Sequence, residues 1–95
     1  MVIHYYAIFD RKAKSFGEPL AFGSPEKDAV TRWFRDLVMS DSKSLLYRYS
    51  EDFDLFYLGW FDKTLGEFFP SDEGKEYVVN AAVFFADKEE EALEE

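Results

Sequence analysis

The sequence predicts an α+β fold: a mainly antiparallel sheet of three to five strands with one amphipathic helix packed across a face. Aromatic and β-branched runs recur along the chain with turn residues between them, and one segment has apolar residues at helical spacing. The 95 residues are 47% hydrophobic, so a chain of single-domain length has enough apolar surface for a core. We expect one globular domain over residues 1–86 and an acidic C-terminal tail over residues 87–95.

The first expected strand covers residues 2–9, which form an almost continuous apolar run. His4, Tyr6 and Ile8 share one face of this strand because side chains alternate along it. His4 is the single histidine, and no acidic or nucleophilic partner stands near it in the sequence. A hydrogen-bonded structural role is therefore favoured for His4 over a catalytic one.

Residues 10–17 are expected to form a polar loop, and residues 19–22 a short second strand. The loop holds the densest cluster of cations in the chain, namely Arg11, Lys12 and Lys14. Two interpretations stay open for this cluster. It is a solvated loop, or it contacts the phosphates of a nucleic acid, whose charge clustered Lys and Arg neutralise.

The clearest helix is expected over residues 24–39. Ser24 is a suitable N-cap, Pro25 suits the first helical position, and Glu26 and Asp28 favour the positive end of the helix dipole. An apolar stripe at helical spacing is expected to cover the sheet. Its members are Ala29, Val30, Trp33, Phe34, Leu37 and Val38.

Arg32 and Arg35 lie outside the apolar stripe of this helix. Arg32 is spaced to pair with Asp28 or Asp36 on the helix surface, which is the structural interpretation of this residue. The alternative is that both arginines face a nucleic acid. We expect Trp33, within the stripe, to be buried.

Residues 51–69 are the most aromatic stretch of the chain and are expected to form a β-hairpin. The first strand covers residues 53–61, and a turn follows over residues 62–66, where Asp62 can bond its own backbone and Gly66 can adopt positive φ. The return strand begins at Phe68 and ends at Pro70, which has no N–H for the ladder. The stretch holds seven aromatic residues: Phe53, Phe56, Tyr57, Trp60, Phe61, Phe68 and Phe69.

Simple alternation makes both faces of the strand over residues 53–61 apolar. One face carries Phe56, Leu58 and Trp60, and the other carries Phe53, Leu55, Tyr57 and Phe61. The helix is expected to cover one face, which leaves the other for a second copy of the chain or for stacked nucleobases. Tyr57 and Trp60 are the candidate stacking or interface residues.

The remaining segments are less regular. Residues 40–52 are expected to form a loop with a short turn or 3-10 segment at residues 45–47, and residues 71–74 a turn. Residues 77–85 are β-branched and aromatic, which favours a strand.

The net charge of −9 is distributed unevenly. Residues 1–48 hold 8 Lys and Arg against 6 Asp and Glu, whereas residues 49–95 hold 3 against 14. The overall acidity argues against non-specific duplex binding, but the basic residues of the first half can share a face.

Nothing in the sequence supports catalysis, a cofactor or a metal ion. Cysteine is absent, so no thiolate site is expected, and no glycine-rich phosphate loop or nucleophile elbow appears. Asp52, Asp54 and Asp62 do not have the spacing of a calcium loop. No apolar run approaches the roughly 20 residues of a membrane span.

Three segments taken together resemble a known family. They are YAIFDRKAKSFGEPL at residues 6–20, AVTRWF at residues 29–34 and EDFDLFYLGWFDKTLGEF at residues 51–68. Their order and spacing are similar to those of the small non-structural protein of gokushovirus-type microviruses, which are single-stranded DNA phages. The most specific part is Leu-Phe-x-Leu-Gly-x-Phe-Asp-x-x-x-Gly at residues 55–66.

The resemblance implies a phage protein that binds single-stranded DNA during genome replication and packaging. Our first hypothesis is such a protein, located in the host cytoplasm and acting as a homodimer or larger homo-oligomer. Under this hypothesis the phosphate contacts come from Arg11, Lys12, Lys14, Arg32 and Arg35. The alternative is an acidic protein–protein interaction module that forms homo-oligomers without binding DNA.

Overall fold

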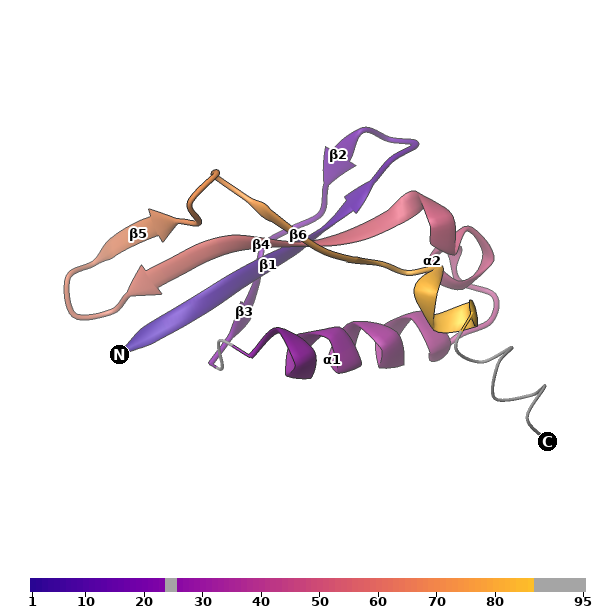
Figure 1. Cartoon of the computed structure of the whole chain (residues 1–95), viewed down its shortest axis with the longest axis horizontal. Helices are drawn as coiled ribbons and strands as arrows, with labels where there is room; N and C mark the ends of the chain where they lie inside the picture. Colours follow the sequence, from indigo (N-terminus) through magenta and orange to yellow (C-terminus); the bar gives the residue numbers. More distant parts are fainter. Residues whose placement is uncertain (24–25, 87–95) are drawn as a thin grey trace.

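The structure is a computed structural model that describes residues 1–23 and 26–86. Its elements in chain order are β1 (Val2–Asp10), β2 (Ser15–Phe16), β3 (Leu20–Phe22), α1 (Lys27–Met39), α2 (Leu45–Arg48), the 3-10 helix η1 (Ser50–Asp52), β4 (Phe53–Asp62), β5 (Glu67–Pro70) and β6 (Glu76–Asn80). All strand pairings are antiparallel. Figure 1 shows α1 lying beneath the sheet, so the expected α+β arrangement is confirmed.

The sheet has six strands, and the expected count of three to five was too low. β1 and β4 pair along their whole length at the centre, β2 and β3 flank β1, and β5 and β6 flank β4. The extra strand is β2, which lies within the segment expected to be a loop. Asp10 accepts hydrogen bonds from the backbone N–H of Lys12 and Ala13, and Lys14 adopts φ 56°, so the chain reverses tightly enough for β2 to pair with β1.

The hairpin of β4 and β5 is confirmed. Asp62 accepts hydrogen bonds from the backbone N–H of Thr64 and Leu65, and Gly66 adopts φ 68°. Pro70 is the last residue of β5, as expected of a residue without an N–H.

A β-bulge interrupts the pairing of β1 with β4. Tyr5 pairs with Gly59 and Tyr6 pairs with Tyr57, so Leu58 is an extra residue on β4. Gly59 adopts φ 141°, a conformation that L side chains rarely adopt. A bulge of this kind changes the face to which the following side chains point.

The bulge corrects the face assignment made by simple alternation. Trp60 pairs with His4, and Tyr57 pairs with Tyr6. Because His4 and Tyr6 share one face of β1, Trp60 lies on the same face as Tyr57 and not on the opposite one. Phe61 correspondingly moves to the other face of the sheet.

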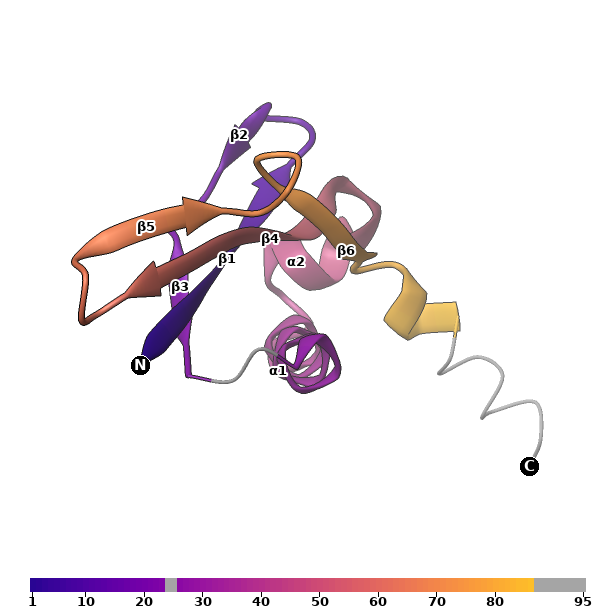
Figure 2. The same ribbon diagram turned by 60° about the vertical axis from the view of Figure 1, so that its left-hand side comes forward.

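The core lies between α1 and the facing side of the sheet, as Figure 2 shows with α1 seen end-on. Three α1 residues one turn apart, Val30, Phe34 and Val38, are buried there. Trp33 is only partly buried, with its ring centroid 5.1 Å from that of Phe22, so the expectation of a buried Trp33 was too strong. The buried members of the core cluster are Tyr6, Val30, Phe34, Val38, Leu55, Ala81 and Phe84.

α1 begins at Lys27, later than expected, with Glu26 as its N-cap residue. The proposed roles of Ser24 and Pro25 lie outside the described residues, as does the acidic tail over residues 87–95. The expected loop over residues 40–52 contains two short helices, α2 and η1.

The strand expected over residues 77–85 was wrong in its second half. β6 ends at Asn80, and residues 83–86 are helical. The Asn80 side chain accepts from the backbone N–H of Ala82, which turns the chain out of the sheet. Phe84 then packs its ring 5.8 Å from that of Phe34, so its apolar character reflects burial against α1.

Candidate nucleic-acid interface

The face of the sheet opposite α1 carries a continuous aromatic surface. Strand pairing places Phe9 beside Phe16, and Phe56 beside Tyr77. The Phe16 centroid lies 4.8 Å from that of Phe9 and 5.4 Å from that of Phe56, and Phe56 lies 5.8 Å from Tyr77. We call these four residues, Phe9, Phe16, Phe56 and Tyr77, the aromatic platform.

No helix covers the aromatic platform in the part of the chain that the structure describes; Figures 1 and 2 show α1 on the other side of the sheet. Phe16 is 40% exposed and Tyr77 is 54% exposed. Exposed neighbouring rings on a rigid sheet are the arrangement on which nucleobases stack in many single-strand binding proteins.

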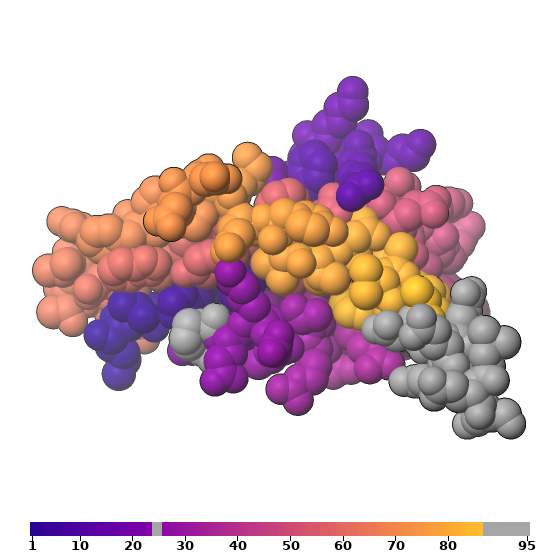
Figure 3. Space-filling view, viewed as in Figure 1, coloured from indigo at the N-terminus to yellow at the C-terminus, as the bar shows by residue number. Residues whose placement is uncertain are grey.

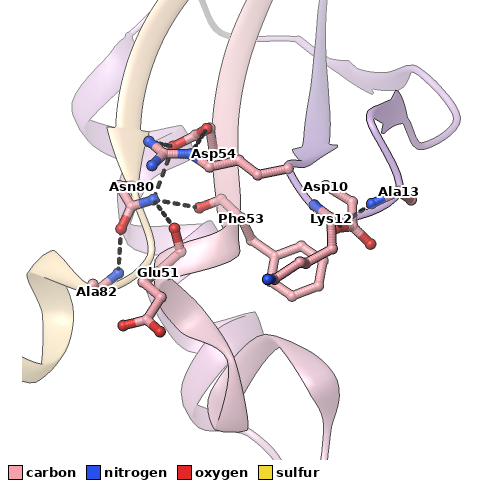
Figure 4. Close-up of polar contacts among 9 residues, drawn as sticks. Asp10, Lys12, Ala13, Glu51, Phe53, Asp54, Asn80 and Ala82 are labelled. Atoms are coloured by element: carbon pink, nitrogen blue, oxygen red, sulfur yellow. Dashed lines mark hydrogen bonds and ion pairs between the residues drawn. The ribbon is translucent and has the colours of Figure 1, made fainter.

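Arg11 extends over this face and forms a two-point ion pair with Asp54. Its Nε and Nη2 donate to the Asp54 carboxylate at 2.7 and 2.9 Å. Asp54 is 4% exposed and also accepts from Asn80 Nδ2 at 2.8 Å (Figure 4). Hydrogen bonding to Asp54 raises the pKa of Arg11. Arg11 is thus bound within the fold, although 53% of its side chain stays exposed.

Lys12 and Lys14 occupy the tight turn between β1 and β2, and both are exposed. Lys12 lines a shallow hollow with Leu45, Tyr49 and Phe53, on the α2 side of the turn. Neither lysine forms an ion pair within residues 1–23 and 26–86. The turn therefore presents two exposed cations at the end of the aromatic platform where Phe16 lies, and Asp10 and Asp52 line the hollow beside Lys12.

Arg32 and Arg35 lie on the exposed surface of α1. Figure 1 places α1 below the sheet and the β1–β2 turn above it, so the structure does not gather the five predicted cations on one face. The pairing of Arg32 with Asp28 or Asp36 is not seen among the described residues.

Tyr57 and Trp60 lie on the α1 side, away from the aromatic platform. A hydrogen bond of 2.9 Å joins His4 Nδ1 to the Tyr57 hydroxyl, which agrees with a structural role for His4. Burial raises the pKa of the Tyr57 hydroxyl. Trp60 stacks on Phe69, with ring centroids 4.3 Å apart. Tyr57 and Trp60 line a pocket of about 440 Å³.

Sequence reasoning did not identify the aromatic platform. Alternation along β1 places Tyr5, Ala7 and Phe9 on one face, and alternation along β4 places Phe56 on an apolar face, but neither pattern shows that the two faces join. Phe16 and Tyr77 join that face through pairings between distant segments, which local patterns do not reveal.

Within residues 1–23 and 26–86, no group of three or more His, Asp or Glu side chains is placed to hold a metal ion. The same residues include no helix of the length and apolarity required to cross a membrane.

Comparison with known proteins relates the chain to phages. The family described as phage ORF5 protein matches residues 3–91. Protein ORF5 of Chlamydia phage 1 is 54% identical over 90 residues, which cover 94% of each chain. No solved structure matches the chain significantly. Neither name states a ligand or an activity, but the expected relation to a small phage protein is confirmed. The chain belongs to the phage ORF5 protein family.

Proposed function

We propose that this phage protein binds single-stranded DNA in the host cytoplasm, with bases stacked on the aromatic platform. The observation that carries the proposal is an uncovered sheet face on which Phe16 and Tyr77 expose 40% and 54% of their surface. Base–aromatic stacking is independent of sequence, because every base has a π-face. The proposed role is replication and packaging of the genome, without catalysis or a cofactor.

Lys12 and Lys14 supply the phosphate contacts in this proposal. They are exposed, they form no ion pair among the described residues, and they lie in the chain reversal that leads to β2, where Lys14 is two residues before Phe16 and Lys12 lies on the α2 side. Arg11 contributes through its exposed part while it remains paired with Asp54. Arg32 and Arg35 face away from the platform, so they are the natural control for this assignment.

Because the chain is acidic, electrostatic attraction contributes little to its proposed affinity for DNA. With a net charge of −9, long-range attraction of DNA is weak, and the few cations at the turn have only local effect. Stacking is then the larger source of affinity, which distinguishes the protein from single-strand binders with a basic groove.

Fluorescence anisotropy of labelled oligo-dT tests the platform directly. We expect Tyr77→Leu to weaken binding about 5- to 150-fold, the equivalent of the roughly 1–3 kcal/mol per stacked base. Leu65→Ala is the control, because Leu65 is 62% exposed in the turn between β4 and β5, outside the aromatic platform and away from Lys12 and Lys14. Equal affinities of the two variants and the unaltered chain would contradict the proposal, as would the absence of any binding at low salt.

A second candidate function is homo-oligomer formation, and a separate part of the uncovered face favours it. Near β5 the face forms an almost uncharged hollow of about 310 Å³ lined by Tyr5, Pro19, Leu58, Phe61 and Phe68. Exposed apolar patches of this kind mark protein–protein contacts. In this candidate the chain is an interaction module that binds its own copies and not DNA.

Light scattering tests the second candidate. Phe68 is 47% exposed, so Phe68→Lys is expected to convert an oligomer into a monomer. Leu45→Lys is the matched control, because Leu45 is 60% exposed on α2, away from the hollow. A monomeric unaltered chain would reject this candidate and leave DNA binding by the monomer as the function to test.

A further inference from the structure

The pocket beside Trp60 is a separate site on the α1 side of the sheet. It has a volume of about 440 Å³, which lies within the usual range for ligand sites. β4 supplies two aromatic walls, and the β5–β6 connection and the start of β6 supply the polar rim; Figure 2 shows this connection as a wide loop. The lining residues are Tyr57, Trp60, Pro70, Ser71, Asp72, Glu73, Lys75 and Glu76.

The bulge in β4 creates the aromatic part of this pocket. Without the extra residue Leu58, the rings of Tyr57 and Trp60 would point to opposite faces. Gly59 permits the bulge, because a Cβ at this position would lie 2.3 Å from the Phe69 carbonyl oxygen. Phe69 stacks on one face of Trp60, which fixes the indole ring at the pocket wall.

The polar rim is acidic. Asp72, Glu73 and Glu76 contribute three carboxylates, against one ammonium group from Lys75. Asp72 and Glu73 are exposed and form no ion pair in the described structure. Ser71 adds a buried hydroxyl oxygen that has no hydrogen-bond partner there. Phosphate is repelled by such a rim, so a nucleotide is a poor occupant.

The pocket wall already binds one cation of the chain itself. Lys27 Nζ lies 2.6 Å from Glu76 Oε2 and 5.9 Å from the centroid of the Tyr57 ring. Figure 3 shows the start of α1 meeting the start of β6 on this face. The Tyr57 ring and the Glu76 carboxylate thus accept an ammonium group in this geometry. Trp60, Asp72 and Glu73 have no cationic partner among the described residues.

We propose that this pocket binds an arginine side chain of a basic polypeptide. A guanidinium group is planar, stacks on an indole ring and donates to carboxylates at its edge, which matches Trp60 with Asp72 and Glu73. The charge of the described residues around the pocket favours a basic partner, since residues 49–86 hold 8 Asp and Glu against 2 Lys and no Arg. The site lies on the face opposite the aromatic platform and does not depend on DNA binding.

Trp60 fluorescence tests the proposal in a Trp33→Phe background, which leaves Trp60 as the single tryptophan. The probe is the peptide acetyl-Gly-Gly-Arg-Gly-Gly-amide, and its citrulline analogue has the same shape without the charge. We expect a saturable change in Trp60 emission with the arginine peptide and none with the citrulline peptide.

Two charge-matched double variants locate the contact. Asp72→Asn with Glu73→Gln is expected to weaken the peptide about twofold to fivefold for each carboxylate removed. Glu18→Gln with Glu67→Gln removes the same charge from exposed positions outside the pocket lining and is expected to leave affinity unchanged. Circular dichroism confirms that each variant is folded.

Three results would overturn the proposal. The first is an equal response to the arginine and citrulline peptides, and the second is an equal loss in both double variants. The third is a response of Trp60 to oligo-dT without a response to the arginine peptide, which would assign the pocket to a nucleobase. A Tyr77→Leu variant that loses oligo-dT binding in the anisotropy experiment but keeps the Trp60 response to the arginine peptide separates this site from the aromatic platform.

Discussion

Asn80 Nδ2 lies within 3.2 Å of three acceptors: the backbone carbonyls of Glu51 and Phe53 and the Asp54 carboxylate. Its Oδ1 accepts from the backbone N–H of Ala82. One side chain thus connects η1, β4 and the end of β6, and it helps to satisfy the buried charge of Asp54 (Figure 4). Loss of this amide leaves Asp54 with Arg11 as its side-chain partner.

Asn80→Ala is expected to lower the free energy of unfolding by about 1–3 kcal/mol, the usual cost of removing a hydrogen bond to a charged group. Urea denaturation measures this change in the free energy of unfolding. Asn80→Asp provides the contrast, because it keeps an acceptor for Ala82 but places a second carboxylate beside Asp54. We expect Asn80→Asp to be at least as destabilising as Asn80→Ala at neutral pH; a neutral effect of both would show that Arg11 alone satisfies Asp54.

Gly59 is the second residue on which local structure depends. Its φ of 141° is a strained conformation for other residues, and a Cβ would meet the backbone of Phe69 and Pro70 at 2.3 and 2.7 Å. The contact is with backbone, so a rotamer change cannot relieve it.

Gly59→Ala is therefore expected to lower the free energy of unfolding by more than the roughly 1–3 kcal/mol that backbone strain alone costs, because β5 must also shift. Gly66→Ala is the matched control: Gly66 also has positive φ, at 68°, but no atom lies within 4 Å of its Cβ position. Thermal unfolding compares the two. Equal losses of stability would mean that the close approach of β4 and β5 is not maintained in solution.

At the scale of elements, α1 covers one face of the sheet and leaves the other open. Phe34 on α1 is fully buried, whereas Phe16 on β2 is 40% exposed. The same substitution at these two positions therefore separates packing from ligand binding.

Phe34→Ala is expected to destabilise the fold by about 3–5 kcal/mol, because it opens a cavity beneath the sheet. Phe16→Ala leaves no enclosed cavity, so it should lower the free energy of unfolding much less. The same variant should have a lower affinity for oligo-dT. Urea unfolding and anisotropy on both variants check this. A stability loss at Phe16 as large as that at Phe34 would indicate that the platform is covered in solution.

The elements differ in how far local sequence determined them. The β4–β5 hairpin and α1 were predicted because Asp62, Gly66 and the stripe containing Phe34 act within a few residues of one another. The helical turn around Phe84 was mistaken for strand, since burial against α1 and burial within a sheet both select apolar residues. The position of Trp60 was wrong because one bulged residue, Leu58, reverses alternation after it.

The candidate site was less predictable than the fold. The cations at Arg11, Lys12 and Lys14 were visible as a cluster, but Asp54, the partner of Arg11, lies 43 residues away in the chain. Phe16 and Tyr77 meet on one face through β1 and β4, so their proximity depends on the assembled sheet. Long-range pairing of this kind has no local signal.

At the scale of the whole molecule, the two faces of the sheet have different chemistry. The uncovered face has the aromatic platform with the β1–β2 turn at its end, and the α1 side has the acidic pocket. A net charge of −9 is compatible with DNA binding when contact is limited to one face and to a few phosphates.

The most direct measurement is the salt dependence of oligo-dT affinity for two double variants with equal loss of charge. Lys12→Gln with Lys14→Gln removes the cations at the turn, and Arg32→Gln with Arg35→Gln removes those on α1. For a single strand the slope of log affinity against log salt is about −0.7 for each phosphate contact, so the lysine pair should reduce its magnitude by about 1.4. The arginine pair should leave the slope unchanged. A larger reduction with the arginine pair would place the DNA on α1 and contradict binding on the uncovered face.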